Sequence, residues 1–349
     1  MNYFQRYLAE EFAEDYSEGR ISRRKALKLI ASVTGSVVVA NTILAACAPP
    51  PEGAALGTAT AGVPVTGTEP AMPTSAVAST ATPAVMETAG GAATAGATAA
   101  GTTAAGAATA TTPTGAAETP AGTAPASTPG AAGENVPVSP DDPAVTASDV
   151  EFPGQDGATL MAYLARPADA SGPQPVVLVC HENRGLTDHI RDVTRRLAKA
   201  GYVALAVDLL SRQGGTGSVG SENVPGALGN IEPDQFVNDF ISGWNYLKEQ
   251  DFAQADRVGM VGFCFGGGVT WRVATKMPEL LAAVPYYGPP PPVEEINPIN
   301  AAVLAIYGGN DARINASIPE IEGAMQASDK VYEKMIYEGA DHAFNNDTG

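Results

Sequence analysis

Downstream of residue 144, two hydrophobic patterns alternate along the chain. Short continuous apolar runs are typical of strands buried on both faces of a sheet, and apolar residues at helical spacing are typical of helices with one buried face. The predicted strands are 175–180, 202–210, 258–263, 282–287, 302–308 and 334–340. The predicted helices are 188–200, 233–250, 267–277 and 319–328, and a hairpin is predicted over 150–167. Strands that alternate with helices predict an α/β fold, a doubly wound and mostly parallel sheet with helices on both faces.

A different composition precedes this region. From residue 48 to about residue 135 the chain consists almost entirely of Ala, Thr, Gly and Pro. Such a segment has no apolar periodicity and cannot bury enough surface to offset the entropy of an ordered chain. We therefore predict a disordered linker over 48–143 and one globular domain over 144–349.

The net charge of the chain limits which kinds of molecule it can bind. The formal net charge is −18, from 20 basic and 38 acidic residues, and no stripe of Lys and Arg occurs in the predicted domain. A strongly acidic chain repels phosphate, so we exclude a nucleic-acid partner.

Three cysteines occur in the chain, Cys47, Cys180 and Cys264. Cys47 lies upstream of the predicted domain, so the folded part has at most one disulfide, between Cys180 and Cys264. Disulfides therefore cannot be the main source of its stability. The turn described below requires Cys264 to be free.

Residues 1–47 carry two features of an exported bacterial protein. The pair Arg23-Arg24 resembles a twin-arginine export signal. After a moderately apolar run, the stretch LAAC ending at Cys47 resembles the lipoprotein box, whose cysteine becomes the lipidated first residue after cleavage. We expect residues 1–47 to be a signal peptide and Cys47 to anchor the domain on the extracytoplasmic face of the membrane. An uncleaved anchor is the alternative, because the apolar run approaches the ~20 residues that a span needs.

The sequence GFCFG at 262–266 lies between a predicted strand and a predicted helix, at the strand end where ligands bind in such folds. It fits the nucleophile elbow, in which the nucleophile takes strained backbone angles and the residues two before and two after must be small. Gly262 and Gly266 meet that need. The helix that follows favours a thiolate at Cys264 through its N-terminal amides. The alternative is a structural cysteine buried beside a tight turn.

Partners for Cys264 follow two later predicted strands. Asp311 follows 302–308, and His342 follows 334–340. In the α/β-hydrolase fold the nucleophile, the acid and the histidine occur in this order, each at a strand end. We therefore predict an α/β-hydrolase with the triad Cys264, Asp311 and His342.

The other candidate residues are weaker. His189 opens a predicted helix, and we expect it at the surface. His181, at a strand end, is a core residue, a residue supporting the site or a direct participant. Ser218 lacks the leading glycine of an elbow. The histidines do not have the spacing of a metal site.

Four motifs together resemble the dienelactone hydrolase family of α/β-hydrolases: GFCFGGG around Cys264, YGGNDARIN around Asp311, GADHAFN around His342 and CHENRGL after residue 179. The resemblance extends from about Ser148 to the end of the chain. Members of this family open enol-lactone rings that carry a carboxylate, by way of a thioester on the cysteine. The resemblance implies a hydrolase that needs no cofactor.

The resemblance also implies roles for residues around the triad. Glu182 corresponds to the glutamate that contacts the resting thiol and controls its proton. The oxyanion donors would be the backbone amides of Asn183 and Phe265. Arg212, in DLLSRQ, matches the arginine of the family's DLYxRQ segment that binds the substrate carboxylate.

The chain departs from the family pattern in two places. The family's second carboxylate-binding arginine, four residues after the histidine, is Asn346 here, which leaves the substrate open. Arg184 and Arg313 are alternative carboxylate-binding residues, and a solvated loop position is the alternative for Arg212. Relatives also continue through a last helix, whereas this sequence stops at Gly349, so we expect the natural protein to extend further.

These patterns predict a cysteine-dependent hydrolase. We expect a monomeric domain that acts on a small ester or lactone. His342 would deprotonate Cys264, the thiolate would attack the acyl carbon, and water activated by the same histidine would release the acid. Two alternatives stay open: a broad carboxylesterase or peptidase with the same triad, and a noncatalytic surface binding protein on a hydrolase scaffold.

Overall fold

The computed structural model describes residues 1–46 and 137–348, which belong to one compact unit of the chain. The predicted lipidation site, Cys47, and the predicted linker up to residue 136 lie outside the described residues. The linker's last predicted residues, 137–143, are packed against the domain: the amide of Val138 donates to Asp192 Oδ1.

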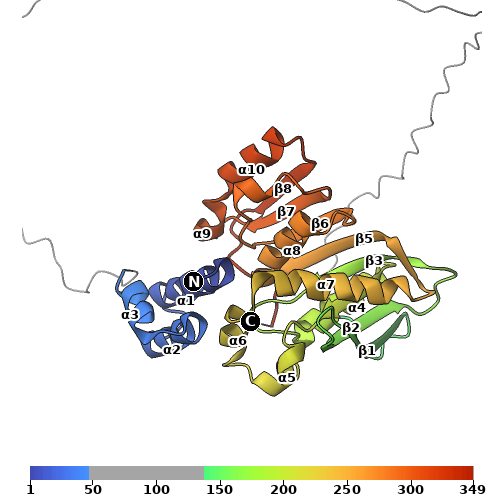
Figure 1. Cartoon of the computed structure of the whole chain (residues 1–349), viewed down its shortest axis with the longest axis horizontal. Helices are drawn as coiled ribbons and strands as arrows, with labels where there is room; N and C mark the ends of the chain where they lie inside the picture. The colour runs from blue at the N-terminus through green and yellow to red at the C-terminus, as the bar shows by residue number, and fades with distance from the viewer. Residues whose placement is uncertain (47–136, 349) are drawn as a thin grey trace, which may run out of the picture. The chain divides into compact units, whose positions relative to one another are not determined.

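One sheet organises the described part of the chain, with strand order β1-β2-β4-β3-β5-β6-β7-β8 (Figure 1). Strand β2 pairs antiparallel with β1 on one side and with β4 on the other, and the remaining neighbours are parallel. The strands are β1 (Val145–Pro153), β2 (Thr159–Pro167), β3 (Gln174–Cys180), β4 (Val203–Val207), β5 (Ala253–Phe263), β6 (Ala282–Tyr286), β7 (Ala302–Gly308) and β8 (Tyr332–Tyr337). This confirms the doubly wound, mostly parallel sheet predicted from the hydrophobic pattern.

The helices between the strands cover both faces of the sheet. They are α4 (Asp188–Lys199), α5 (Thr216–Val219), α6 (Val224–Gly229), α7 (Pro233–Lys248), α8 (Phe265–Lys276), α9 (Ala312–Asn315) and α10 (Ile318–Ala327), with short 3₁₀ turns η1 (Ser211–Gln213) and η2 (Val293–Glu295). Strands β4 and β5 lie on opposite sides of β3. Because such crossovers are right-handed, α4 and α7 pack on opposite faces of the sheet.

The order of the strands brings two distant segments together. Strands β3 and β5 are parallel neighbours, and Cys180 at the end of β3 is paired with Gly262 near the end of β5. The residues that follow β3 therefore lie beside the turn that follows β5, at the carboxyl edge of the sheet, where ligands bind in this kind of fold.

Strand β4 is shorter than the apolar run 202–210 predicts. It ends at Val207 because Asp208 turns the chain: its Oδ1 accepts from the amide of Leu210, and its Oδ2 accepts from the amide of Thr216. A carboxylate that bonds amides a few residues ahead favours a turn over a strand.

The N-terminal region forms three helices: α1 (Tyr3–Ser17), α2 (Arg23–Thr34) and α3 (Val37–Ala46). The last two are separated by Gly35, at a φ of 69°. Helix α1 contacts α2, α6 and α8, and its residues Phe4, Leu8 and Phe12 belong to the same apolar core as the sheet. Within 1–46 and 137–348, no helix has the length and apolar character needed to cross a membrane.

Candidate active site

The turn between β5 and α8 holds Cys264 in a strained conformation. Its φ is 56° and its ψ is −118°, between a strand that ends at Phe263 and a helix that begins at Phe265. Residues other than glycine rarely take a positive φ, and a strained strand-to-helix turn is the geometry of a nucleophile elbow.

The two glycines that flank the elbow are required by close backbone contacts. A Cβ on Gly262 would lie 2.1 Å from the carbonyl oxygen of Gly266. A Cβ on Gly266 would lie 2.4 Å from the carbonyl oxygen of His181. Any side chain at either position would therefore displace the backbone of the turn, which is the steric requirement inferred from the sequence.

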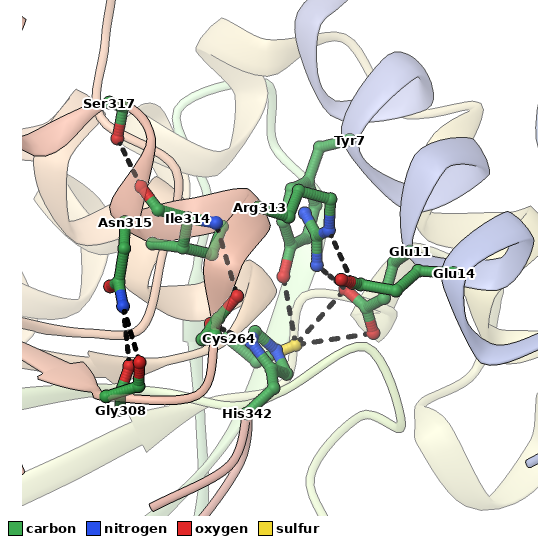
Figure 2. A network of polar contacts seen from close by, with 12 residues as sticks. Tyr7, Glu11, Glu14, Cys264, Gly308, Arg313, Ile314, Asn315, Ser317 and His342 are labelled. Carbon is green, nitrogen blue, oxygen red and sulfur yellow. Dashed lines mark hydrogen bonds and ion pairs between the residues drawn. The ribbon is translucent and has the colours of Figure 1, made fainter. Parts of the chain in front are cut away.

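Asp311 and His342 come from the loops after β7 and β8. Asp311 precedes α9, and its Oδ1 accepts from the amide of Ile314 at 3.2 Å. Its Oδ2 accepts from Nδ1 of His342 at 2.6 Å, which leaves Nε2 of the imidazole available to the thiol. A ring nitrogen of His342 and Sγ of Cys264 lie within 4.8 Å of each other, and Figure 2 shows the imidazole beside the sulfur. The structure thus brings together the three residues that the sequence pattern nominated.

The surroundings of Cys264 and His342 shift both of their pKa values upward. Burial raises the pKa of the Cys264 thiol, and the nearby carboxylate of Glu11 raises it further, although His342 opposes the change. Burial disfavours the charged imidazolium, but the hydrogen bond to Asp311 and the proximity of Cys264 raise the pKa of His342 well above its usual range. Burial and Glu11 thus disfavour the thiolate of Cys264, and Asp311 makes the imidazole of His342 more basic.

The segment after β3 lines the same site. Glu182 is buried and accepts from Nδ2 of Asn346 at 2.5 Å, so the residue in place of the family's second arginine contacts this glutamate. Burial raises the pKa of Glu182, and the bond from Asn346 opposes this shift. His181 is buried too: its Nδ1 lies 2.7 Å from the carbonyl oxygen of Glu182, and its Nε2 accepts from the amide of Leu209. His181 thus links the segment after β3 to the segment after β4.

Two residues from helix α1 contact the sulfur, and the sequence pattern gave no sign of them. The hydroxyl of Tyr7 lies 3.3 Å from Sγ of Cys264, and both carboxylate oxygens of Glu11 lie 3.6 Å from it. Oε1 of Glu11 also accepts from Nδ2 of Asn183 at 2.6 Å. Tyr7 and Glu11 are one helical turn apart, a spacing present in YLAEEF, but nothing in the sequence indicates that this face of the helix reaches the thiol.

The three candidate arginines lie in different settings. Arg212 forms ion pairs with the exposed Asp156 and the buried Asp239 at 2.8 Å each and is absent from the lining of the cavity described below. Its predicted role in substrate binding therefore gains no geometric support. Arg184 lines the cavity. Arg313 donates to Glu14 at 2.8 Å and lies over the ring of Tyr7, 4.9 Å from its centroid.

A cavity of about 1160 Å³ opens at Cys264. Glu182, Asn183 and His342 form part of its wall, and residues of α1 and α2, including Glu11 and Arg24, form another part. A cavity that meets a thiol, an imidazole and buried polar groups is the usual form of a small-molecule site.

Two further sequence expectations can be compared with the structure. Cys180 and Cys264 are both free thiols, so the disulfide left open by the sequence is not formed. His189, expected at the surface, is buried, and its Nδ1 lies 3.4 Å from Oδ1 of Asp347. The expectation of a surface position was wrong, and the contact with Asp347 joins two segments that are far apart in sequence.

One group of side chains has the donor types and spacing of a metal site. Glu11, Cys264 and His342 each offer one ligand atom, and these atoms lie within 4.8 Å of one another. Carboxylate, thiolate and imidazole are the ligands that zinc uses. A metal ion bound here would occupy both the thiol and the imidazole, so it would block the nucleophile rather than assist it.

The fold and this arrangement define an α/β-hydrolase, and comparison with known proteins gives its family. Residues 160–349 match the model of the dienelactone hydrolase family. A protein of Escherichia coli (strain K12), provisionally named carboxymethylenebutenolidase, is 36% identical over 226 residues, which cover 60% of this chain and 81% of that protein. The chain belongs to the dienelactone hydrolase family and is a hydrolase of this kind.

Two other proteins extend the comparison. A Bradyrhizobium protein provisionally named 2-oxo-3-(5-oxofuran-2-ylidene)propanoate lactonase is 32% identical over 204 residues, covering 55% of this chain and 82% of its own. The crystal structure of a provisionally assigned dienelactone hydrolase from Klebsiella pneumoniae has a TM-score of 0.54 and 34% identity, covering 58% of this chain and 88% of its own. The family model begins at residue 160, within β2, and so includes most of the sheet.

Proposed function

We propose that the protein hydrolyses small esters or lactones through a thioester on Cys264. The observation that carries the proposal is the position of this thiol at a strained elbow, next to an imidazole whose other nitrogen is held by Asp311 at 2.6 Å. A nucleophile, a base and a group that orients the base are the minimum set for acyl transfer.

The chemistry proceeds in two halves. His342 takes the thiol proton, and the thiolate of Cys264 forms a bond to the acyl carbon while the carbon–oxygen bond of the ester breaks. The departing oxygen takes the proton from His342. In the second half His342 deprotonates a water molecule, which attacks the thioester carbon, and the thiolate leaves and recovers its proton from the histidine. The acid product is released, and no cofactor is consumed.

The oxyanion of each tetrahedral intermediate needs two hydrogen-bond donors. We assign this role to the backbone amides of Phe265 and Asn183. Phe265 is the first residue of α8, so its amide has no acceptor within the helix. Asn183 follows β3, which is the parallel neighbour of β5. Donors that are fixed before the reaction supply a large share of acyl-transfer catalysis.

For the substrate we favour a small lactone or ester that carries a carboxylate. The Bradyrhizobium relative is named for a lactone with a propanoate group. In this chain, Arg184 lines the cavity and is the simplest partner for such a carboxylate. A broad carboxylesterase with the same triad is the alternative, and it would accept neutral aryl esters equally well.

The test is a panel of neutral aryl esters and of lactones with and without a carboxylate, followed by intact-mass measurement after acid quenching. We expect hydrolysis together with an acyl adduct on Cys264 that hydroxylamine removes. Substrate turnover without any adduct on Cys264, under conditions in which acylation outpaces deacylation, would contradict the thioester route. No turnover across the panel, both by the full chain and by the chain cut between residues 53 and 132, would favour a noncatalytic binding protein.

We also propose that residues 1–47 direct export and that Cys47 carries a lipid anchor. The support comes from the Arg23-Arg24 pair and the LAAC stretch. Expressed in a lipoprotein-processing bacterium, the protein should fractionate with membranes, and Cys47→Ser should prevent lipid attachment. Mature protein without lipid mass on Cys47 would contradict the anchor.

A further inference from the structure

Helix α1 lies over the thiol of Cys264. Figure 2 shows Tyr7 and Glu11 projecting from this helix toward the sulfur. The thiol can donate to the Glu11 carboxylate at 3.6 Å, which leaves the Tyr7 hydroxyl, at 3.3 Å, to donate to the sulfur. Cys264 is only 3% exposed. The group proposed to attack the substrate is therefore already engaged by residues of the same chain.

The carboxylate of Glu11 occupies the position that a substrate's acyl group needs. An acyl carbon must come within about 3–3.5 Å of the nucleophile to react. Both oxygens of Glu11 lie 3.6 Å from Sγ. The carboxylate therefore faces the sulfur on the side from which an acyl carbon would approach. Oε1 is also bonded to Asn183 Nδ2 at 2.6 Å. A substrate in the cavity would have to displace this carboxylate to bring its acyl carbon to the sulfur.

The helix is held in place by apolar packing and by Arg313. Phe4 packs against Phe236 and Phe265, with ring centroids 5.4 Å and 5.0 Å away. Arg313 donates to Glu14 at 2.8 Å, and its guanidinium lies 3.9 Å from Glu11 and over the ring of Tyr7. These contacts are of the kind that hold a core together, so docking of α1 does not depend on the Glu11 carboxylate alone.

Charge at the docked site also keeps the nucleophile inactive. The groups that face the thiol are Glu11 and Tyr7 from α1, His342 from the loop after β8, and Glu182 from the segment after β3. The Glu11 carboxylate disfavours a thiolate beside it, and it raises the pKa of Cys264 in addition to the effect of burial. Glu11 therefore opposes catalysis in two ways, by filling the acyl position and by making the thiolate harder to form.

We propose that residues 1–46 are an internal inhibitor of the hydrolase, with Glu11 bound as a mimic of the carboxylic acid product. The inference rests on the proposed function, since the product of ester hydrolysis is a carboxylate at this position. It also assigns a carboxylate subsite. Asn183 and Arg313 contact Glu11, and a small carboxylate would bind there in competition with Glu11. Cleavage before Cys47, as predicted from the LAAC stretch, would separate the inhibitor from the domain, so removal of the leader should raise the activity of the enzyme.

The first experiment compares two substitutions in the full chain. Glu11→Ala removes the carboxylate at the sulfur, and Glu10→Ala is the matched control, because Glu10 is on the same helix, is exposed and pairs with Arg6. The readout is the rate at which iodoacetamide alkylates Cys264, identified by peptide mass. We expect Glu11→Ala to raise that rate by about tenfold or more, as for a site released from a mostly closed state. Glu10→Ala should leave it unchanged. Equal rates in all three proteins would overturn the proposal.

The second experiment releases the whole segment from folded protein. A specific protease site is placed between residues 53 and 132, the purified protein is cut, and the fragments are separated by dilution and gel filtration. Release should raise both alkylation of Cys264 and kcat/KM. A peptide of residues 1–20 added back should inhibit, and the same peptide with Glu11→Ala should inhibit at least about tenfold less. Loss of hydrolysis on release, with the circular dichroism unchanged, would overturn the proposal and make α1 part of the catalytic site.

The alkylation readout separates this proposal from the proposed function. If the protein hydrolyses nothing on the substrate panel, faster alkylation after release still supports the covering of Cys264 by α1, and only the catalytic role fails. If hydrolysis is found but release and Glu11→Ala change neither alkylation nor kcat/KM, the inhibitor is disproved and the hydrolase stands.

Discussion

Cys180 and Cys264 stand at the carboxyl ends of neighbouring strands, β3 and β5, and both are buried free thiols. Burial raises the pKa of Cys180, and no charged group among the described residues opposes the shift. Cys264 is equally enclosed, but it has left its strand for a turn at positive φ, where it meets His342, Glu11 and Tyr7. The comparison teaches that burial alone makes a thiol inert, and that the turn, by presenting the sulfur to polar groups, makes it a candidate nucleophile.

The largest expected effect separates these two cysteines directly. Cys264→Ala should lower kcat/KM by at least about 10⁴-fold, because only binding and oxyanion contributions remain without a nucleophile. Cys180→Ala should cost about 1 kcal/mol of stability and leave kcat/KM within a few-fold of the parent. Steady-state kinetics and thermal unfolding of both variants test this. Comparable activity losses in the two variants would mean that a cysteine at the end of either strand supports catalysis, whether or not it lies in the elbow.

The next effect concerns the residue that orients His342. Asp311→Asn should lower kcat by about 10³-fold, because the amide cannot hold the imidazole in the tautomer that accepts the thiol proton. The matched control is Asp341→Asn, next to His342 in sequence but bonded to Asn310 instead. The control should stay near parent activity. Stopped-assay kinetics with one aryl ester suffice, and equal effects of the two substitutions would remove Asp311 from the triad.

A third test breaks the elbow without touching the cysteine. Gly262→Ala places a Cβ 2.1 Å from a backbone oxygen, so we expect a loss of about 3 kcal/mol in unfolding free energy together with most of the activity. Gly259→Ala, on the same strand, places its Cβ 3.5 Å from the nearest atom and should cost about 1 kcal/mol or less. Denaturant unfolding of both variants gives the comparison. A stable, active Gly262→Ala protein would show that the turn is not strained as described.

A smaller effect is expected at Arg212. Its removal leaves the fully buried carboxylate of Asp239 without its cation, so Arg212→Ala should lower the unfolding free energy by about 2–3 kcal/mol. Asp156→Asn, which removes only the exposed partner, should cost distinctly less. The ratio of kcat/KM for carboxylate-bearing and neutral substrates should stay the same. A selective loss on anionic substrates would instead restore the substrate-binding role implied by the family resemblance.

The smallest effect is a shift in a pH profile. The carboxylates of Glu11 and Glu182 both raise the pKa of Cys264, beyond the effect of burial. Removing the charge of Glu182 therefore makes the thiolate easier to form, and in Glu182→Gln the alkylation profile of Cys264 should move to lower pH. Glu151→Gln, on the exposed face of β1, is the control and should not move it. A shift to higher pH in Glu182→Gln would mean that this glutamate helps to remove the thiol proton.

Much of the domain was predictable because it rests on local patterns. Continuous apolar runs are typical of strands covered on both faces, and the runs at 175–180 and 302–308 became β3 and β7 with bounds within a residue or two. The elbow was predictable for the same kind of reason. Gly262 and Gly266 are demanded by contacts within one short turn and one neighbouring strand, so the requirement is visible in five consecutive residues.

The remaining features depend on contacts between segments that are far apart in sequence. Tyr7 and Glu11 contact Cys264 although more than 250 residues separate them in sequence. No local pattern indicates which face of a distant helix will pack against the thiol. The ion pairs of Arg212 with Asp156 and Asp239 likewise arise from segments brought together by the sheet. The sequence alone determined the strands, the elbow and the identities of the three triad candidates, since each follows from short-range sterics or from order along the chain. Only the tertiary structure decided which charges face the thiol, because the energy of a charge depends on every neighbour within a few ångströms, whatever its place in the sequence.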